Sequence, residues 1–371
     1  MNLTEQHVKT MDEWRFCPMA NYICPTARET KNEANTPRGL ALTAYLFYRG
    51  KNDFSADAVR TFYECSLGGL CKTTALDASD VPALIRAVRA EIVARKKAPQ
   101  EVYRLRDRII AHQSLSATDE QATYEPSAAA DDARTLYFGT PWYSPAHEAT
   151  VKSGADLLNL AEVSFSVLER RLDTGALLYE LGFHDEVKTF AQAILNEIER
   201  RQVKKVIFSS AYDLRAFSVY YAELGIHIPD ELKVEPLAET LREQLDQGHL
   251  KPARMISKQA AYLDPSYLVH ELQIGGTSRQ ILTHLMQDKP VELRWQGSQT
   301  RYCGGAGLQF LYPTLARRVI ARNIGELVGH RKLGLLVSEC PFCVREIQQI
   351  NTGFQVVDLP SLLLSTIQGG R

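Results

Sequence analysis

Seven cysteines in a chain of 371 residues fall into three short groups, and this clustering is the strongest constraint on what the chain can fold into. Two groups lie near the start, in "FCPMANYICPT" and "YECSLGGLCKT", and one lies near the end, in "RYCGGAGLQF" and "SECPFCVRE". In chain order the cysteines are Cys17, Cys24, Cys65, Cys71, Cys303, Cys340 and Cys343. In a reducing compartment, clustered cysteines more often bind metal or carry out redox chemistry than form disulfides.

The composition indicates such a compartment. Hydrophobic residues make up 45% and charged residues 23% of the chain, which is typical of a globular protein. The formal net charge of −1 gives no basic excess for nucleic acid. No apolar run is long enough to span a bilayer, and the polar start "MNLTEQHVKTMDEWRF" has no signal-peptide core. We therefore expect a cytoplasmic protein with reduced thiols, no transmembrane segment and no nucleic-acid partner.

The first hundred residues are predicted to form a small helical unit around four of the cysteines. Residues 38–50 and 56–64 have helical patterns. Residues 79–97 form an amphipathic helix that Ser79 can cap. The polar stretch 112–132 has no periodicity and is typical of a linker or surface loop. The expected division is a helical domain over 1–100 and a linker over 101–134.

From residue 135 onward, predicted strands and helices alternate, which indicates parallel α/β units. The predicted strands are 135–140, 204–211, 291–295, 333–339 and 354–359, and the longest predicted helices are 184–202 and 313–331.

This region also contains a weak internal repeat. "RRLDTGALLYELGF" can be laid over "TRYCGGAGLQFLYP", and "VIFSSAYDLRAF" lies over "LLVSECPFCVRE" in the same register without a gap. Thr174 then matches Cys303, Ala211 matches Cys340 and Leu214 matches Cys343. We expect two copies of one α/β unit, over 135–254 and 255–371, of which only the second kept cysteines.

With this arrangement the chain resembles iron–sulfur subunits that join a helical two-cluster ferredoxin domain to tandem cysteine-rich "CCG" domains. These include heterodisulfide reductase D-type subunits and the iron–sulfur subunits of glycolate and glycerol-3-phosphate dehydrogenases. The resemblance covers residues 14–364. It implies an α/β fold class in which a helical ferredoxin-like domain precedes two tandem CCG-type α/β units.

The ferredoxin domain of such proteins carries two C-x2-C-x2-C-x3-C-P runs, and about half of their ligand positions are kept here. In the first run, Cys17 and Cys24 stand at the second and fourth positions. In the second run, Cys65 and Cys71 stand at the first and third positions. The remaining four positions hold Trp14, Ala20, Gly68 and Ala75.

The CCG domains normally offer a lone cysteine, then Cys-Cys-Gly, then C-x2-C. The second copy keeps Cys303, Cys340 and Cys343, while Ser266 and Tyr302 replace the other two cysteines. The first copy keeps none; its positions hold Thr140, Asp173, Thr174, Ala211 and Leu214. All seven cysteines thus fall on ligand positions of the family.

The resemblance implies one or two iron–sulfur clusters, [4Fe–4S] or [3Fe–4S]. The fourth cysteine of one ferredoxin run ligates the cluster of the other run, which assigns Cys24, Cys65 and Cys71 to one cluster. Its fourth ligand is absent at Gly68. In a rival arrangement, Cys17 joins these three on a single cluster or a single Zn²⁺. A second site would use Cys303, Cys340 and Cys343; the alternative is that these three are buried core thiols.

The implied function is electron transfer between a flavoprotein partner and another acceptor within an oxidoreductase complex, since the chain itself has no flavin-binding signature. One alternative is a disulfide-type reductase with catalysis at an open-iron C-terminal cluster, although the loss of cysteine at positions 266 and 302 counts against it. The other is a cluster-poor scaffold paralogue, which the loss of every ligand in the first CCG copy favours.

Overall fold

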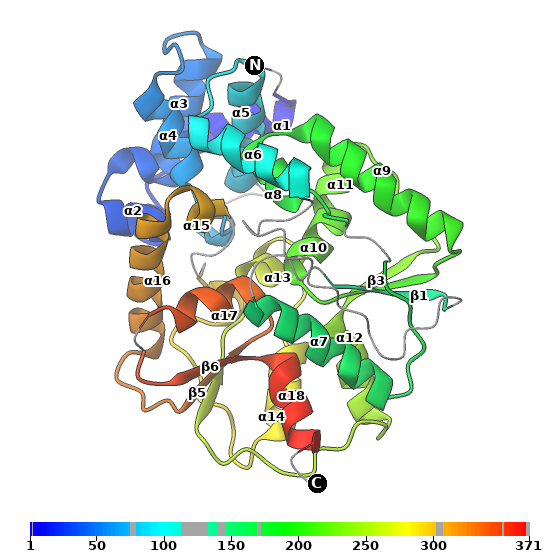
Figure 1. The fold of residues 1–371 in the computed structure, drawn as a ribbon. Coiled ribbons are helices and arrows are strands. Elements are labelled where there is room, and N and C mark those ends of the chain that lie inside the picture. Colours follow the sequence, from blue (N-terminus) through cyan, green and yellow to red (C-terminus); the bar gives the residue numbers. More distant parts are fainter. Residues whose placement is uncertain are drawn as a thin grey trace.

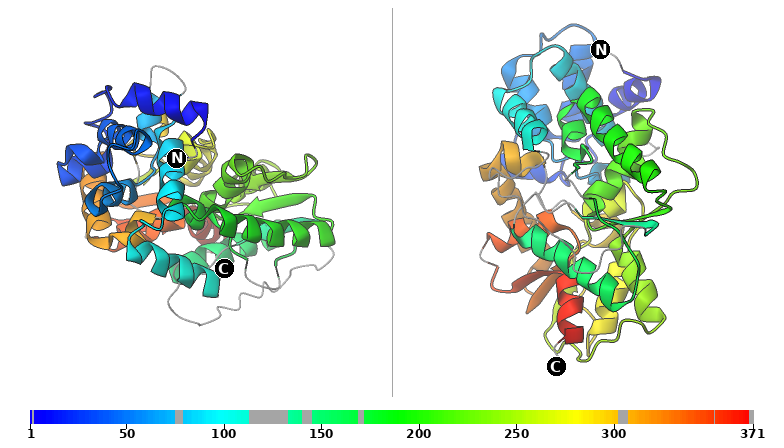
Figure 2. Two further views of the ribbon diagram at one scale, coloured as in Figure 1. Left: turned by 90° about the horizontal axis from the view of Figure 1, so that it is seen from above. Right: turned by 45° about the vertical axis from the view of Figure 1, so that its right-hand side comes forward.

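The computed structural model describes residues 1, 3–74, 79–112, 133–139, 145–168, 172–301, 307–350 and 352–368. The N-terminal helices gather at one end of the molecule and the two sheets lie toward the other, with the termini at opposite ends (Figures 1 and 2).

The N-terminal part is helical, as the sequence predicted. Its helices are α1 (Glu5–Trp14), α2 (Pro25–Thr30), α3 (Pro37–Tyr48), α4 (Ala56–Glu64), α5 (Val81–Ala94) and α6 (Gln100–His112), with short 3₁₀ turns η1 (Glu33–Asn35) and η2 (Leu70–Thr74). Helix α6 lies within the range predicted as a linker, and its Val102, Leu105 and Ile109 are buried. That part of the range is therefore helix, because these three residues form an apolar stripe at helical spacing.

The predicted cap of α5 is wrong by one residue. Asp80 is the N-cap, and its carboxylate accepts a hydrogen bond from the backbone N–H of Ala83 at 2.9 Å. Ser79 instead accepts a hydrogen bond from the indole N–H of Trp14 at 2.7 Å. Both residue types favour N-caps, so the sequence alone could not choose between them.

Two three-stranded parallel sheets confirm the α/β class. The first contains β1 (Thr135–Phe138), β2 (Lys205–Phe208) and β3 (Lys233–Pro236), with β2 in the middle. The second contains β4 (Ala260–Tyr262), β5 (Leu335–Ser338) and β6 (Gln355–Asp358), with β5 in the middle.

One predicted strand is wrong. Residues 291–295 lie outside both ladders, although the N–H of Val291 donates to the carbonyl of Ala260 at 2.7 Å. The β-branched and alternating character of this segment suits a strand, but propensity is overridden where the tertiary fold supplies no continuous partner.

The two sheets carry similar helices. The first is accompanied by α7 (Pro145–Leu160), α8 (Ala176–Leu181), α9 (His184–Arg200), α10 (Ala211–Arg215), the π-helical segment η3 (Ala216–Tyr220), α11 (Tyr221–Glu223) and α12 (Leu237–Asp246). The second is accompanied by α13 (Ser266–His270), α14 (Thr277–Leu285), the 3₁₀ turn η4 (Gly297–Gln299), α15 (Gly307–Leu311), α16 (Pro313–Val328), α17 (Pro341–Gln348) and α18 (Leu359–Gln368). In each unit the middle strand runs directly into a short helix, α10 or α17, as the internal repeat predicts.

The cores are continuous across these parts. One apolar cluster extends from Trp14 and Phe62 in the N-terminal helices to Leu336 and Phe342 beside the second sheet. A second cluster joins the two sheets and includes Ile207 of β2 and Val337 of β5, together with residues of α7 and α18. The N-terminal helices are therefore packed on the α/β units rather than tethered to them. Within the described part of the chain, no helix has the length and apolarity needed to cross a membrane.

Candidate functional site

Three of the four N-terminal cysteines line one cavity. Cys24, Cys65 and Cys71 reach it from three different segments. The rest of the wall is apolar or glycine-rich and is formed by Pro25, Pro37, Leu40, Ser66, Leu67, Gly68, Gly69, Leu70, Val81 and Pro82. Cys17 is not part of this wall, so the described structure brings together the three cysteines assigned by cross-ligation and leaves out the fourth.

Local structure explains how each thiol is presented. Cys24 is the N-cap residue of α2, just before a proline that starts the helix. Cys65 is the C-cap residue of α4, with extended backbone angles that turn the chain away from the helix. Cys71 lies in η2. Helix ends and a tight turn therefore supply the three donors.

The loop between Cys65 and Cys71 requires glycine at one position. Gly69 has φ of +78°, and a Cβ placed there would lie 2.7 Å from Cβ of His270. A side chain is excluded both by the backbone conformation and by the close contact. The imidazole of His270 is itself held by the Thr300 carbonyl, 2.9 Å from Nε2, so this loop rests against a fixed part of the second α/β unit.

The electrostatics of the cavity favour neutral thiols when no metal is bound. Burial raises the pKa of Cys24 to about 12, and the nearby Cys65 contributes to that rise. Burial also raises the pKa values of Cys65 and Cys71, and Cys71 is further raised by both other cysteines. Binding of a metal group would release their protons.

The three-thiol cavity, meaning Cys24, Cys65 and Cys71 with the loop Ser66–Leu70, offers three sulfur donors from three segments of the chain. Among the described residues, no three His, Cys, Asp or Glu side chains converge closely enough to hold one metal ion. Thiolates are the donors that iron–sulfur clusters use, and a cluster accepts them at separate corners. An apolar, glycine-containing wall also limits solvent, which is one way a protein tunes such a group.

The residues do not fit the second cluster of a two-cluster ferredoxin domain. Trp14 and Ala20, which stand at two of its ligand positions, are buried core residues with 2% and 0% exposure. The indole of Trp14 is fixed by its hydrogen bond to Ser79. Cys17 is partly exposed. Ala75 lies outside the described residues.

In the first α/β unit, the described positions that the resemblance matches to ligands hold buried polar and apolar groups. The hydroxyl of Thr174 donates to the carboxylate of Asp213 at 2.8 Å, and Asp173 accepts from the N–H of Gly175 at 2.6 Å. Burial, and then the neighbouring Asp213, raises the pKa of Asp173 to about 7. Ala211 and Leu214 are buried apolar residues. Thr140 lies outside the described residues.

In the second unit, Cys340 is the N-cap of α17 and Cys343 lies within its first turn; both are buried. Burial raises the pKa of Cys340 to about 12. Cys343 is disulfide-bonded in the structure. Ser266 is buried at the start of α13. Cys303 and Tyr302 lie outside the described residues, so the convergence of Cys303, Cys340 and Cys343 stays a prediction.

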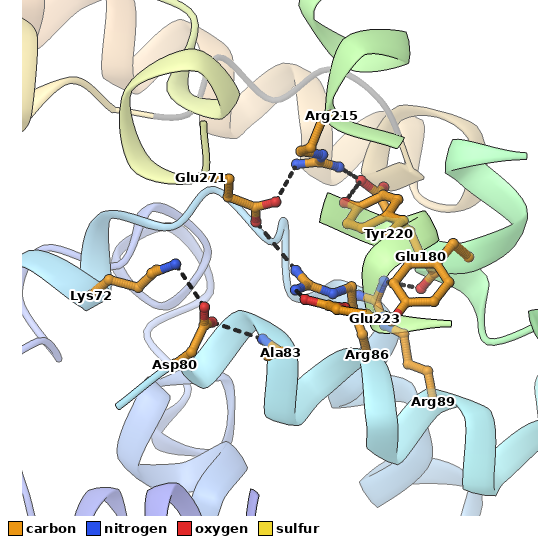
Figure 3. Close-up of polar contacts among 11 residues, drawn as sticks. Lys72, Asp80, Ala83, Arg86, Arg89, Glu180, Arg215, Tyr220, Glu223 and Glu271 are labelled. Carbon is orange, nitrogen blue, oxygen red and sulfur yellow. Dashed lines mark hydrogen bonds and ion pairs between the residues drawn. The ribbon is translucent and has the colours of Figure 1, made fainter. Parts of the chain in front are cut away.

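Sequence reasoning missed the buried charges behind the three-thiol cavity. Arg86 of α5 and Arg215 of α10 are almost fully buried and pair with the carboxylates of Glu180, Glu223 and Glu271 where the N-terminal helices contact both α/β units (Figure 3). Arg89 of α5 is buried beside them. The signal was present in the sequence, because Arg86 and Arg89 lie three residues apart near the apolar face of the helix predicted over 79–97.

No family model matches the chain. It is 26% identical to the D subunit of the dihydromethanophenazine:CoB–CoM heterodisulfide reductase of Methanosarcina mazei. The corresponding proteins of Methanosarcina acetivorans and Methanosarcina barkeri are 24% and 22% identical. Each match covers 93% of this chain and 90% of the relative. These relatives are oxidoreductase subunits by name, and over nearly its whole length the chain is similar to them, which confirms the resemblance to heterodisulfide reductase D-type subunits.

Proposed function

We propose that the chain is an iron–sulfur electron-transfer subunit of an oxidoreductase complex, with Cys24, Cys65 and Cys71 holding one cluster. The observation that carries this proposal is the cavity lined by these three thiols, drawn from three segments. The similarity to D-type subunits of heterodisulfide reductases supports an oxidoreductase role. A bound cluster would supply reversible one-electron transfer.

In this proposal the chain's own residues hold three thiolates, keep the cavity wall apolar and leave one corner without a cysteine at Gly68. The open corner suits a [3Fe–4S] cluster, or a [4Fe–4S] cluster with one other ligand. Electrons would pass between a flavoprotein subunit and another acceptor. A second cluster at Cys303, Cys340 and Cys343 belongs to the same proposal, and it requires that the disulfide bond of Cys343 be reduced before the thiolate can bind iron.

The test is iron and acid-labile sulfide analysis with EPR on anaerobically purified protein. We expect a brown protein with up to about eight irons per chain, the content of two clusters. Cys65→Ala should abolish one cluster signal, whereas the matched variant Cys17→Ala should keep it, because Cys17 lies outside the cavity. Cys303→Ala should remove only the other cluster. Loss of the N-terminal signal in Cys17→Ala would favour the rival four-cysteine arrangement.

The scaffold role is the second candidate, and the ligand positions of the first α/β unit favour it. Asp173, Thr174, Ala211 and Leu214 are all buried there, and none is a soft donor. A colourless wild-type protein with no iron after anaerobic reconstitution would establish this alternative. The disulfide-reductase alternative depends on Cys303, and its test is thiol release from a disulfide substrate.

A further inference from the structure

Helix α5 carries two buried arginines on one face, and they do different things. Arg86 makes ion pairs with the carboxylates of Glu223 and Glu271 at 2.8 and 3.2 Å. Arg89, one turn later, makes hydrogen bonds only to backbone carbonyls among the contacts of the described residues. Figure 3 shows both side chains leaving α5 toward the α/β units.

The guanidinium of Arg89 binds the end of the helix that carries Cys65. Its Nε and Nη2 donate to the carbonyl of Phe62 at 3.0 and 2.6 Å, and Nη2 also donates to the carbonyl of Cys65 at 2.7 Å. The last carbonyls of a helix have no partner within the helix, and a cation there also interacts favourably with the helix dipole. Arg89 thus satisfies carbonyls at the end of α4, where the chain leaves the helix at Cys65.

The same guanidinium binds a second helix end, in the first α/β unit. Its Nη1 donates to the carbonyl of Glu180 near the end of α8, at 2.8 Å. Next to it, the hydroxyl of Tyr63 donates to the carbonyl of Leu181 at 3.2 Å. Gly182 then passes so close to α5 that a Cβ there would lie 2.6 Å from the backbone carbonyl of Arg89. Only glycine fits, and α8 is held tightly against α5.

We propose that Arg89 is a positioning residue of the three-thiol cavity: its planar fork joins the ends of α4 and α8 and holds the backbone of Cys65 in place. This inference rests on the proposed function for the identity of the bound group. The positioning itself is a property of the protein alone. Arg89 is 3% exposed, and it also supplies a buried positive charge near Cys65.

Lysine at position 89 separates geometry from charge. Arg89→Lys keeps the charge and most of the length but has a single ammonium group, which cannot reach three carbonyls in a plane. Arg89→Met removes both the positive charge and the planar set of hydrogen-bond donors. Arg86→Met is the matched control. It also removes a buried arginine from α5, but among the described residues the Arg86 side chain makes no hydrogen bond to the Cys65 segment.

The first measurement uses reduced, metal-free protein. The rate of maleimide labelling at Cys65 is compared with that at buried Cys340 in the same molecule by peptide mass spectrometry. We expect the Cys65-to-Cys340 ratio to rise at least about tenfold in Arg89→Met and by a similar factor in Arg89→Lys, because the Cys65 segment opens locally. In Arg86→Met both rates should rise together. An unchanged ratio in Arg89→Lys would overturn the proposal, and this variant is decisive if Arg89→Met does not fold.

The second measurement uses reconstituted protein. Both Arg89 variants should bind less iron and change the EPR line shape of the N-terminal cluster. A normal spectrum in Arg89→Lys would leave only a role for charge and would overturn the geometric role. If the wild-type protein binds no iron, the proposed function fails, while the labelling ratio still decides the role of Arg89.

Discussion

At the positions that the family resemblance matches to ligands, the first α/β unit holds buried groups with an electrostatics of their own. In the first α/β unit, a carboxyl group at position 173 stands beside Asp213 in a buried setting where two negative charges are costly. The backbone N–H of Gly175 compensates only part of that cost. The site therefore favours a protonated carboxyl group over a second negative charge.

Asp173→Asn should flatten the pH dependence of stability. The pKa of Asp173 is about 7 in the folded chain, above its ordinary value of 3.8. Its contribution to stability is thus fully present below about pH 4 and is lost as pH rises through about 7. The variant should gain roughly 1–4 kcal/mol relative to wild type over that interval, measured by urea unfolding at several pH values. Asp185→Asn, on an exposed position of α9, is the control. Parallel curves for wild type and Asp173→Asn would contradict this.

At the scale of elements, the sequence predicted the long helices α9 and α16 and four of the six strands that the structure describes. The helices at 56–64 and 184–202 were predicted because each has an apolar stripe at helical spacing. Strands β3 and β4 were missed. β3 reads "KVEP", which is charged and ends in proline, and β4 is only "AAY". Such strands form because a neighbouring parallel strand pairs with them, and the residues of the strand itself do not show that this neighbour exists.

The candidate site, too, was predicted from the sequence only in part. The cross-ligation that the family resemblance implies grouped Cys24, Cys65 and Cys71, and all three line one cavity, while their binding of a cluster stays a prediction. What holds the segments in place could not be predicted, because Arg89, Gly182 and His270 act through contacts between residues far apart in the sequence.

Helix α2, which begins right after Cys24, is fixed to α16 of the second unit by ion pairs. Arg28 forms a two-pronged pair with Glu326, both distances being 2.6 Å, and Arg301 joins at 2.6 Å. Glu29 binds Arg318 and Arg322 at 2.8 Å each. The two helices lie side by side in Figure 1.

Glu326→Gln should loosen α2 without unfolding the molecule. The side chains of Arg28 and Glu326 are about one quarter exposed, so the cost is about 1–2 kcal/mol, more than for an isolated surface pair, because two arginines lose their partner. We expect amide hydrogen exchange in residues 25–30 to speed up by roughly tenfold, with α9 unchanged as the internal control. High salt should reduce the difference between wild type and variant. Equal acceleration in α9 would indicate global destabilisation instead.

For the molecule as a whole, Glu271 is one of the residues that connect all three parts. It follows α13 of the second unit, pairs with Arg86 of the N-terminal helices at 3.2 Å, and pairs with Arg215 of the first unit at 3.5 Å. All three side chains are at most 4% exposed. Figure 3 shows Glu271 between the two guanidinium groups. Charges buried this completely are strongly dependent on their partners.

Glu271→Gln should therefore destabilise the whole molecule by about 3–5 kcal/mol, because Arg86 and Arg215 lose a shared buried partner. The control Asp156→Asn breaks the exposed pair with Lys152 and should cost no more than about 0.5 kcal/mol. Urea unfolding followed by tryptophan fluorescence and by far-UV circular dichroism measures both.

The double variant Arg86→Met, Glu271→Met tests whether the loss arises from uncompensated charge. Removing both charges leaves Arg215 with Glu180, so the double variant should be less destabilised than the sum of its single variants, by roughly 1–3 kcal/mol. Additive losses would mean that Glu271 acts through packing alone.

The same unfolding curves test whether the three parts unfold together. If the fluorescence and circular dichroism transitions separate in Glu271→Gln, the three parts unfold independently once this junction is weakened. Coincident transitions in wild type and separated ones in the variant would identify Glu271 as the residue that makes the three-thiol cavity and the α/β units fold as one cooperative body.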